Sequence, residues 1–346
     1  MRRWFLIAFV ALALAPGTWV RSPPRTETHS QTVTASPLQL GARQFGQLQL
    51  AGAWELTSPN SDFGSYSALL ALDGGQLMAG SDTGKLLIMP APGQSAASQA
   101  SPPGTVRIEN FAGKTASKKK LVDIESLTRD PASGRIWVGY EGINSLERLD
   151  ADLTGAKRIR PAEMRRWSSN SGPEAMVRLN DGSFIVLSEG RADWWSGDFP
   201  ALLYSSDPVE GAVPEKFAFA APEGFRPVDM AQLPDGRVLV LVRKMNIGLP
   251  PSFDVSVMLA DPADIRRAIS QNRPWRGKVL GTISGADVQD NYEGLAIVPR
   301  ADGPRTDGQS ADGPRGSDEV TLWLISDNNR SAFQRTLLLK LHWNPA

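Results

Sequence analysis

Cysteine is absent from this chain of 346 residues, and only two histidines occur. The missing cysteines exclude disulfides, thiolate nucleophiles, cysteine-ligated zinc and iron–sulfur clusters. His29 and His342 lie near the two ends of the chain, which argues against a Ser-His-Asp triad and against a histidine-rich metal site. Any chemistry must therefore rest on carboxylates, arginine or lysine, hydroxyl groups or a hard metal ion.

An excess of charge of one sign is also missing. Lysine and arginine together number 37, as do aspartate and glutamate, so the formal net charge is zero. The run Lys118–Lys120 is the one basic cluster, and we interpret it as a solvated loop. We therefore expect no nucleic-acid partner.

The N-terminus has the pattern of a targeting segment. Arg2 and Arg3 precede twelve apolar residues, from Trp4 to Ala15, whereas a membrane span needs about 20. This pattern predicts an export signal, or an uncleaved anchor if the apolar run extends to Val20. The expected segments are 1–20 (signal peptide or signal anchor), 21–44 (flexible linker) and 45–346 (one folded domain). The protein would then be periplasmic or secreted, with membrane contact only through such an anchor.

An acidic phrase recurs along the folded part of the chain. Its copies centre on Glu125, Glu174, Asp229 and Glu293, and a weaker first copy has Ser67 in the place of the acid. The copies are spaced irregularly, by about 50 to 60 residues. A repeat of this length, built from short strands, is typical of a β-propeller or a similar array.

Each phrase leads, through a turn that is mostly of the Asp-Gly type, to a second apolar run that ends in a polar residue. These end residues are Asp82, Glu141, Glu189, Arg243 and Asp327. Asp-Gly pairs between apolar runs indicate hairpins, because tight hairpin turns need positive φ. A hairpin returns to the end where it began, so we expect the pairs 125/141, 174/189 and 229/243 to lie side by side. If these hairpins are the inner strands of blades, carboxylates ring one end of a central channel.

The sequence therefore predicts an all-β chain, a β-propeller of five or six blades in one domain, with six favoured. Five hairpins are visible, and an entry strand at 45–56 could complete a sixth blade with a closing strand at 335–341. Joining the first and last strands within one blade closes a propeller and removes exposed edges. Residues 301–318 repeat the sequence Ala-Asp-Gly-Pro-Arg, and we interpret them as a low-complexity loop insertion at a hairpin tip.

Several of these phrases resemble one known family. Asp123-Ile-Glu125-Ser-Leu127, Asp290-Asn-Tyr-Glu-Gly-Leu295 and Leu324-Ile-Ser-Asp-Asn-Asn329 are similar to the bacterial phytase-like family, often described as "esterase-like activity of phytase". The resemblance spans about residues 60–343. It implies an exported β-propeller related to the calcium-dependent propeller phytases, which bind several Ca²⁺ ions through channel carboxylates and hydrolyse phosphate esters. The name is stronger evidence for the fold than for the activity, because propellers host many functions.

Carboxylates crowded at one mouth repel one another, and each uncompensated buried charge is costly. A hard cation such as Ca²⁺, which takes six to eight oxygen ligands, would relieve this repulsion. The candidate metal ligands are acids from both halves of the repeat: Glu125, Glu141, Glu174, Glu189, Glu293, Asp327 and Asp82. Alternatively, the first-phrase acids accept hydrogen bonds from the backbone of the adjoining blade and knit the ring together.

Asp229 and Arg243 depart from the pattern of the other repeats, so the ring cannot be a symmetric metal cage. It could instead have an acidic half and a basic half. The candidate catalytic residues are Glu174, Glu293 and Arg243, and the candidate substrate-binding residues, which follow the second-phrase strands, are Arg191, Lys244, Arg330 and Asn328. Arg243 could equally form a salt bridge to an acid of a neighbouring blade, and Asn328 could belong to a turn.

Two kinds of function follow from the sequence. The first is an exported, phytase-like hydrolase, a monomer that cleaves small phosphate or other esters with Ca²⁺ at the acidic mouth. A lactonase-like or carboxylic-ester hydrolase would use the same arrangement of metal and channel. The alternative is a non-catalytic envelope propeller that binds a small ligand or a protein partner.

Overall fold

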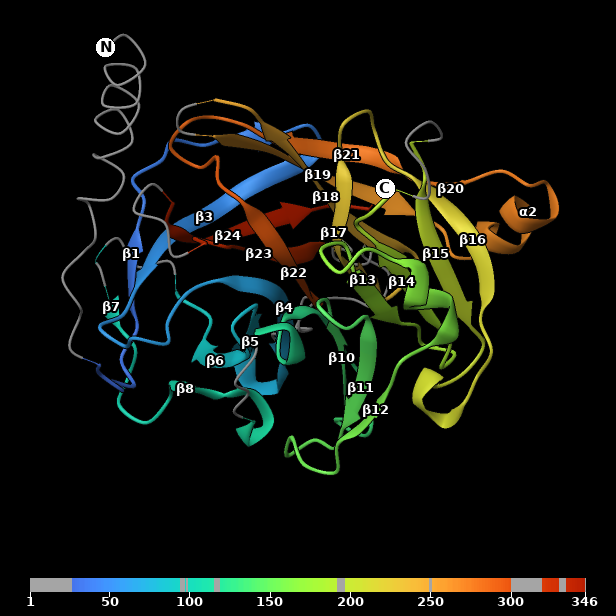
Figure 1. Ribbon diagram of the computed structural model, residues 1–346. Coiled ribbons are helices and arrows are strands. Elements are labelled where there is room, and N and C mark those ends of the chain that lie inside the picture. Colours follow the sequence, from blue (N-terminus) through green and yellow to red (C-terminus); the bar gives the residue numbers. More distant parts are fainter. Residues whose placement is uncertain are drawn as a thin grey trace, which may run out of the picture.

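A computed structural model describes residues 27–93, 97, 99–114, 119–191, 197–248, 251–299, 319–329 and 334–345 of the chain. Within these residues the protein is a single all-β domain with a propeller-like arrangement, in which the sheets stand around a common centre (Figure 1). Helical structure is confined to short segments: η1 (Asp73–Gly75), η2 (Phe111–Gly113), η3 (Lys119–Leu121), η4 (Ala162–Arg166), η5 (Pro208–Glu210) and α2 (Asp264–Ser270). Among the described residues, no helix is long and apolar enough to cross a membrane.

Four sheets are regular blades in which neighbouring strands pair in antiparallel fashion. The first blade contains β4 (Tyr66–Leu72), β5 (Gln76–Ser81), β6 (Lys85–Pro90) and β8 (Arg107–Asn110). The second contains β9 (Ile124–Arg129), β10 (Ile136–Tyr140), β11 (Ser145–Leu149) and β12 (Lys157–Ile159). The third contains β13 (Pro173–Arg178), β14 (Phe184–Ser188), β15 (Phe199–Tyr204) and β16 (Glu215–Ala220), with β20 (Trp275–Arg276) added in parallel. The fourth contains β17 (Arg226–Gln232), β18 (Val238–Asn246), β19 (Ser252–Ala260) and β21 (Lys278–Ile283).

A wider sheet of seven strands closes the ring, and we call it the closing sheet. Its strands are β22 (Tyr292–Pro299), β23 (Val320–Ser326), β24 (Thr336–Trp343), β3 (Leu48–Thr57), β1 (Thr34–Pro37), β7 (Gln99–Ala100) and β2 (Gln44–Phe45). The C-terminal strand β24 pairs with the entry strand β3 from Thr336 opposite Leu56 to His342 opposite Gln49. The first and last strands thus meet within one sheet, which removes exposed edges.

The predicted number of blades, five or six with six favoured, needs correction. The described strands form four regular blades and the closing sheet. β24 pairs with β23 on one side and with β3 on the other. Both of its edges are therefore used, so the entry and closing strands cannot build a further blade of their own. The predicted linker at 21–44 also needs correction, because β1 and the start of β2 lie within it.

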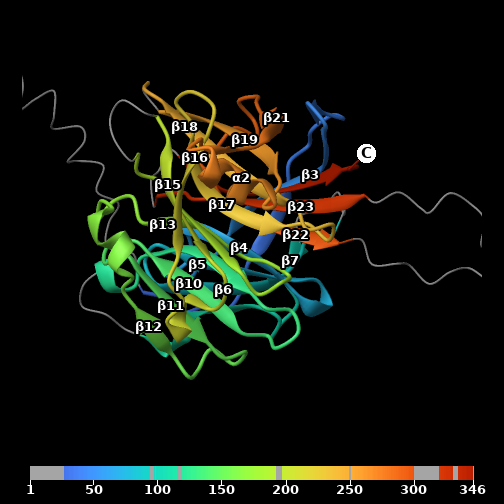
Figure 2. The same ribbon diagram turned by 90° about the vertical axis from the view of Figure 1, so that its right-hand side faces the viewer.

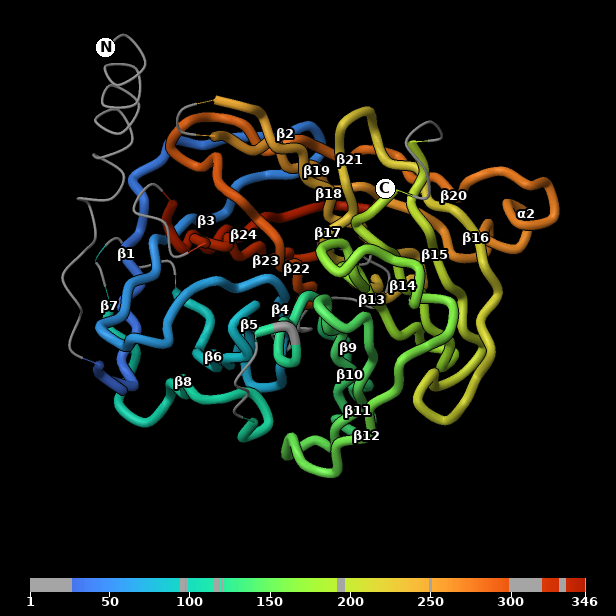
Figure 3. The backbone as a smooth tube through the Cα atoms, in the orientation of Figure 1, coloured from blue at the N-terminus to red at the C-terminus, as the bar shows by residue number. Residues whose placement is uncertain are grey.

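The innermost strands are β4, β9, β13, β17 and β22, and each contacts the next around a closed ring (Figure 3). Figure 2 shows the same domain from the side, with β4, β13, β17 and β22 labelled. β18, the strand beside β17, shows why the sequence reads as continuous apolar runs. Leu239 and Leu241 pack with side chains of the closing sheet, whereas Val238, Val240 and Val242 pack with those of the third blade. A strand buried on both faces needs apolar residues at every position.

Candidate functional site

Every innermost strand contains a β-bulge close to its first residue. The strand pairing skips one residue in each of the five strands, and the unpaired residues are Ser67, Glu125, Glu174, Val228 and Glu293. A bulge sets two residues against one on the partner strand and turns a side chain out of the regular alternation. The bulges therefore bring three glutamates to the same end of the ring.

The bulges correct the alignment of the fourth repeat. Val228, and not Asp229, is the bulged residue of β17, so Asp229 lies one position further along the strand. The predicted pair 229/243 is also wrong, because Arg243 is opposite Arg226 and Asp229 is opposite Leu241. Sequence spacing alone could not show this shift by one residue.

The polar residues that end the second apolar run of each repeat lie at the same end of the ring as the bulged glutamates, as the hairpin pattern predicts. The backbone N–H of Glu141 donates to the carbonyl of Asp123 at 3.0 Å, and that of Asp327 donates to the carbonyl of Asn291 at 2.8 Å. Each second residue thus lies beside the start of its own innermost strand. The pair 125/141 is at one end of the second blade, and the pair 174/189 is at one end of the third.

We call this end of the ring the acidic mouth. Among the described residues, it contains eight carboxyl groups and two basic groups that interact electrostatically with one another. The acids are Asp82, Asp123, Glu125, Glu141, Glu174, Glu189, Glu293 and Asp327, and the bases are Lys119 and Arg243. All seven predicted metal ligands are in this set. Like charges so concentrated are costly unless protons or cations compensate them.

The densest part of the acidic mouth lies at the second blade. One carboxylate oxygen from each of Asp123, Glu125 and Glu141 lies within 4.8 Å of the other two. Repulsion from Asp123 also acts on Glu125 and on Glu141. Carboxyl groups this close to one another are stable only if a proton or a cation compensates part of their charge. A divalent cation could take the place of such a proton.

The pKa values of these acids reflect the crowding. Burial raises the pKa of Glu125 well above its usual value, and repulsion from Glu174 and Glu293 adds to the effect. Burial likewise raises the pKa of Glu141 to about 7, with repulsion from Asp123 as the next cause. For Asp327, burial and repulsion from Glu293 raise the pKa to about 8.

Arg243 occupies the other half of the acidic mouth. Its guanidinium donates to Glu189 at 2.9 Å, to the side chain of Asn291 at 2.5 Å, and to Glu293. Asn291 in turn donates to Glu293 at 2.9 Å. Arg243 therefore joins the fourth blade to the third blade and to the closing sheet. The salt bridge between neighbouring blades, one of the two alternatives from the sequence, is present.

Three of the residues at the acidic mouth were missed by sequence reasoning: Lys119, Asn291 and Asp123, which stood in a recognised phrase but was not among the candidate ligands. The ammonium of Lys119 lies 2.8 Å from Asp82 and 3.4 Å from Asp123, although its basic run suggested a solvated loop. Asn291 is buried between Arg243 and Glu293. Lys119 precedes the second repeat and has no counterpart in the others, so repetition gave no signal. Asn291 stood within a recognised phrase, and its position beside Glu293 was the available signal.

Asp229 has the structural role that the sequence left open for the first-phrase acids. It is fully buried, and its carboxyl accepts backbone N–H groups of Met230 at 2.8 Å and of Leu295 at 2.7 Å. Leu295 belongs to β22, so this side chain ties the fourth blade to the closing sheet. Burial raises the pKa of Asp229 well above its usual value, while these hydrogen bonds lower it in part.

The predicted substrate-binding residues are not brought together in the same way. Arg191 is exposed two residues beyond Glu189, and the side chain of Lys244 lies against Gly224. Asn328 accepts the backbone N–H of Ser65 at 3.1 Å, which links the closing sheet to the first blade. Arg330 lies outside the described residues.

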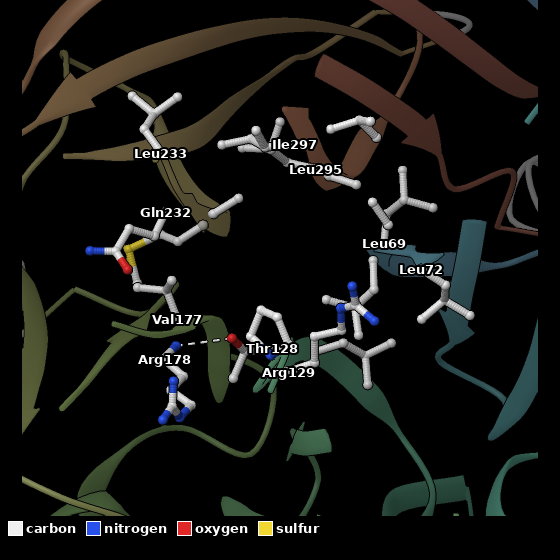
Figure 4. A pocket seen from close by; sticks show the side chains of 18 of the residues that line it. Leu69, Leu72, Thr128, Arg129, Val177, Arg178, Gln232, Leu233, Leu295 and Ile297 are labelled. Carbon is white, nitrogen blue, oxygen red and sulfur yellow. Dashed lines mark hydrogen bonds between the residues drawn. The ribbon is translucent and has the colours of Figure 1, made fainter. Parts of the chain in front are cut away.

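The opposite end of the ring holds a cavity of about 520 Å³, which we call the opposite mouth (Figure 4). All five innermost strands, or the residues directly after them, line this cavity through side chains such as Leu69, Thr128, Val177, Leu233 and Leu295. The cavity is mainly apolar. The acidic mouth, with its cluster of titratable groups, is therefore the better candidate for chemistry.

A family model described as "Phytase-like: Esterase-like activity of phytase" matches residues 61–330. The match covers more than half of the chain, including every described carboxyl group of the acidic mouth. The chain therefore belongs to the phytase-like family. No curated protein matches it.

Solved structures show distant likenesses. A luciferin-regenerating enzyme is 14% identical, with 91% of this chain and 94% of that chain covered and a TM-score of 0.40. The WD40 β-propeller domain of Doa1 is 8% identical, with 86% and 97% covered and a TM-score of 0.36. Hydrazine synthase from Kuenenia stuttgartiensis is 14% identical, with a TM-score of 0.37; 79% of this chain is covered, but it spans only 59% of that chain.

Proposed function

We propose that this protein is a divalent-cation-dependent hydrolase of phosphate esters or other small esters, acting at the acidic mouth. The observation that carries the proposal is the convergence of Asp123, Glu125 and Glu141, with oxygens within 4.8 Å of one another in a largely buried place. Membership of the phytase-like family supports a hydrolase-like propeller. Metal dependence, the substrate and the residue roles are parts of the proposal.

The residues at the acidic mouth fit a hard cation such as Ca²⁺. Such ions take six to eight oxygen ligands, with carboxylates prominent among them. Two buried carboxylate oxygens here, Oδ1 of Asp82 and Oδ1 of Asp123, have no hydrogen-bond partner among the described residues. Asp123, Glu125 and Glu141 would hold the ion, with Asp82 and Glu174 at its edge. A bound cation would neutralise an anionic substrate and polarise its phosphoryl or ester oxygen.

The side chains around this place have separate tasks in the proposal. Glu174 is a buried carboxyl group and Glu293 is a largely buried one, and burial is the main cause that raises the pKa of each above its usual value. A raised pKa favours retention of a proton, so in the proposal each group transfers a proton to a leaving oxygen or accepts one from an attacking water. Arg243, which donates to Glu293 and Glu189, positions these acids. Because its guanidinium already donates to Glu189, Asn291 and Glu293, we assign it this positioning role in preference to direct phosphate binding.

The test is release of inorganic phosphate from phytate and from p-nitrophenyl phosphate by the purified full chain, in Ca²⁺ and in a chelator. We expect release that requires Ca²⁺ and that falls about 100-fold or more in Glu125→Gln. Glu109→Gln, on the outer strand β8, is the matched control and should retain the wild-type rate. A rate that is equal in Ca²⁺ and chelator would contradict the metal dependence.

Two other results would redirect the proposal. Cleavage of p-nitrophenyl butyrate without cleavage of either phosphate ester would assign the site to carboxylic esters. No turnover of any ester, together with a higher melting temperature in Ca²⁺, would favour the non-catalytic propeller that binds a small ligand or partner.

Export and oligomeric state belong to the same proposal. We propose a periplasmic or secreted monomer, on the basis of the arginine pair and apolar run at residues 2–15. Cell fractionation of the full chain, with and without residues 1–20, tests the location. Light scattering of the purified chain tests the monomer.

A further inference from the structure

The acidic mouth carries two built-in cations, and they are held in different ways. Arg243 is largely enclosed, with 18% of its side chain exposed, and its guanidinium is bonded to Glu189, Glu293 and Asn291. The side chain of Lys119 is 57% exposed and has only its ammonium in contact with the acids. One cation is thus fixed inside the ring, whereas the other reaches it from the rim.

The two cations also connect different parts of the ring. Arg243 lies between Glu189 of the third blade and Glu293 of the closing sheet. Lys119 lies between Asp82, which follows the first blade's β5, and Asp123, which precedes the second blade's β9. Each cation therefore bridges two acids that come from different sheets. Such a gap between carboxylates of different sheets is also where a divalent ion would bind.

The contacts of Lys119 leave its acids only partly satisfied. Its ammonium reaches Oδ2 of Asp82, whereas neither Oδ1 of Asp82 nor Oδ1 of Asp123 has a hydrogen-bond partner in the described part of the chain, although both atoms are buried. At 3.4 Å from Asp123 Oδ1, the ammonium gives charge compensation but no hydrogen bond that meets normal geometry. A buried carboxylate oxygen without a partner is costly, and a cation of higher charge would satisfy it.

We propose that Lys119 is a displaceable counter-ion that holds the place of one divalent cation between Asp82 and Asp123. Arg243, in contrast, permanently fills the corresponding place between Glu189 and Glu293. This inference rests on the proposed function, because it assumes that the acidic mouth binds a divalent cation. It adds that the mouth takes one such ion and not several. On binding, the ion takes over both aspartates, and the released ammonium is then available to an anionic substrate at the rim.

Calorimetric titration of the full chain with Ca²⁺ tests the competition. Wild-type protein should bind one ion at the acidic mouth, and Asp123→Asn should abolish that binding. Lys119→Met removes the competing charge and should bind the ion about tenfold more tightly. Lys85→Met is the matched control: Lys85 pairs at 3.0 Å with Asp62, which is not one of the acids of the mouth, and its loss should leave the affinity within twofold of wild type.

A second measurement tests displacement itself. Acetylation of surface lysines by a water-soluble active ester, mapped by mass spectrometry, reports how freely each amine can react. Ca²⁺ should increase the labelling rate of Lys119 several-fold and leave that of Lys85 unchanged. An unchanged or slower rate at Lys119 would show that the ammonium stays on its aspartates and would overturn the proposal.

The outcomes separate this inference from the proposed function. Equal Ca²⁺ affinity in wild type and Lys119→Met overturns the role of Lys119 and leaves the metal-dependent hydrolase standing. No binding of Ca²⁺ to either protein overturns both. Two Ca²⁺ ions bound at the mouth, both lost in Asp123→Asn, would overturn the inference that the mouth takes only one divalent ion.

Discussion

The two mouths of the ring are lined by the same five strands and treat charge in opposite ways. At the acidic mouth the acids stand close together, and burial raises the pKa values of Glu125 and Glu174. At the opposite mouth, Arg129 bonds to Asp73 at 2.7 Å and lowers the pKa of that acid. Arg129 and Glu125 are only ~13 Å apart along β9. At one end of β9 the charged side chain is thus paired with an opposite charge, whereas at the other end carboxyl groups of like charge lie close together.

This difference shows where a ligand has free energy to gain. The opposite mouth is a mainly apolar hollow whose charged groups already have partners. Within the described residues, the acidic mouth has carboxylate oxygens without hydrogen-bond partners and like charges close together, so we expect a cation or a proton to stabilise it. The apolar cavity is therefore a weaker indication of function here than the uncompensated negative charge of the acidic mouth.

The largest expected effect is on catalysis, and two ends of one strand provide the test. Glu174→Gln, at the start of β13, should lower the rate of ester hydrolysis about 100-fold or more, because it removes a proton-transferring group. Arg178→Gln, at the end of β13, should leave the rate within about twofold. Circular dichroism should show both proteins folded. Equal losses in the two variants would mean that the mouths do not differ in function.

Arg243→Met should produce the largest change in stability. It leaves the largely enclosed side chains of Glu189 and Glu293 without their shared cation, which we expect to cost about 3–5 kcal/mol in the free energy of unfolding. Arg129→Met at the opposite mouth should cost under about 1 kcal/mol, because its partner Asp73 has 88% of its side chain exposed. Urea denaturation measures both values. Similar values for the two arginines would contradict the comparison.

Much of this organisation can be predicted from the sequence, and the exceptions have identifiable causes. The Asp-Gly turns predicted hairpins whose ends meet, and the pairs 125/141 and 174/189 do lie together. The misalignment at Asp229 arose because a bulge adds a residue without changing residue type in any regular way. In the fourth strand the added residue is Val228, which carries no charge to mark it.

The remaining errors concern contacts between distant parts of the chain. The blade number was wrong because it depends on which strands flank β24, and hydrophobic patterns do not specify partners. Lys119 was missed because it lies on a connection between blades, outside the repeat. Sequence repetition reveals what the blades share. Here the site also depends on Lys119, in the connection before the second blade, and on Arg243, in the fourth blade, which departs from the repeat.

The pH dependence of stability should follow from the acidic mouth when divalent cations are absent. Burial raises the pKa of Glu141 to about 7 and that of Asp327 to about 8, compared with about 4 in an unfolded chain. A carboxyl group with a raised folded pKa contributes its full stabilisation below the unfolded pKa. That contribution is lost as the pH rises through the folded pKa. The charged groups that face these two acids are Asp82, Lys119, Asp123, Glu174, Glu189, Arg243 and Glu293.

We therefore expect the melting temperature in a chelator to fall between pH 5 and pH 8.5. Added Ca²⁺ should reduce this fall, because the ion replaces the lost protons. The acids of the opposite mouth cannot produce the same trend, since the pKa values of Asp73 and Asp130 are lowered and their titration ends below pH 5. A melting temperature in chelator that rises or stays constant over this range would show that the mouth is not strained by charge.

The smallest effect should come from a link between blades at the opposite mouth. The hydroxyl of Thr128 on β9 accepts the backbone N–H of Arg178 on β13 at 2.9 Å (Figure 4). Thr128→Val removes the acceptor and leaves that N–H unpaired, so we expect a loss of about 1 kcal/mol in the free energy of unfolding. Thr128→Ser keeps the hydroxyl and should recover part of the loss. Neither change should alter Ca²⁺ affinity, because the link lies at the other end of the strand from Glu125. An altered Ca²⁺ affinity in Thr128→Val would mean that the two mouths are coupled through the ring.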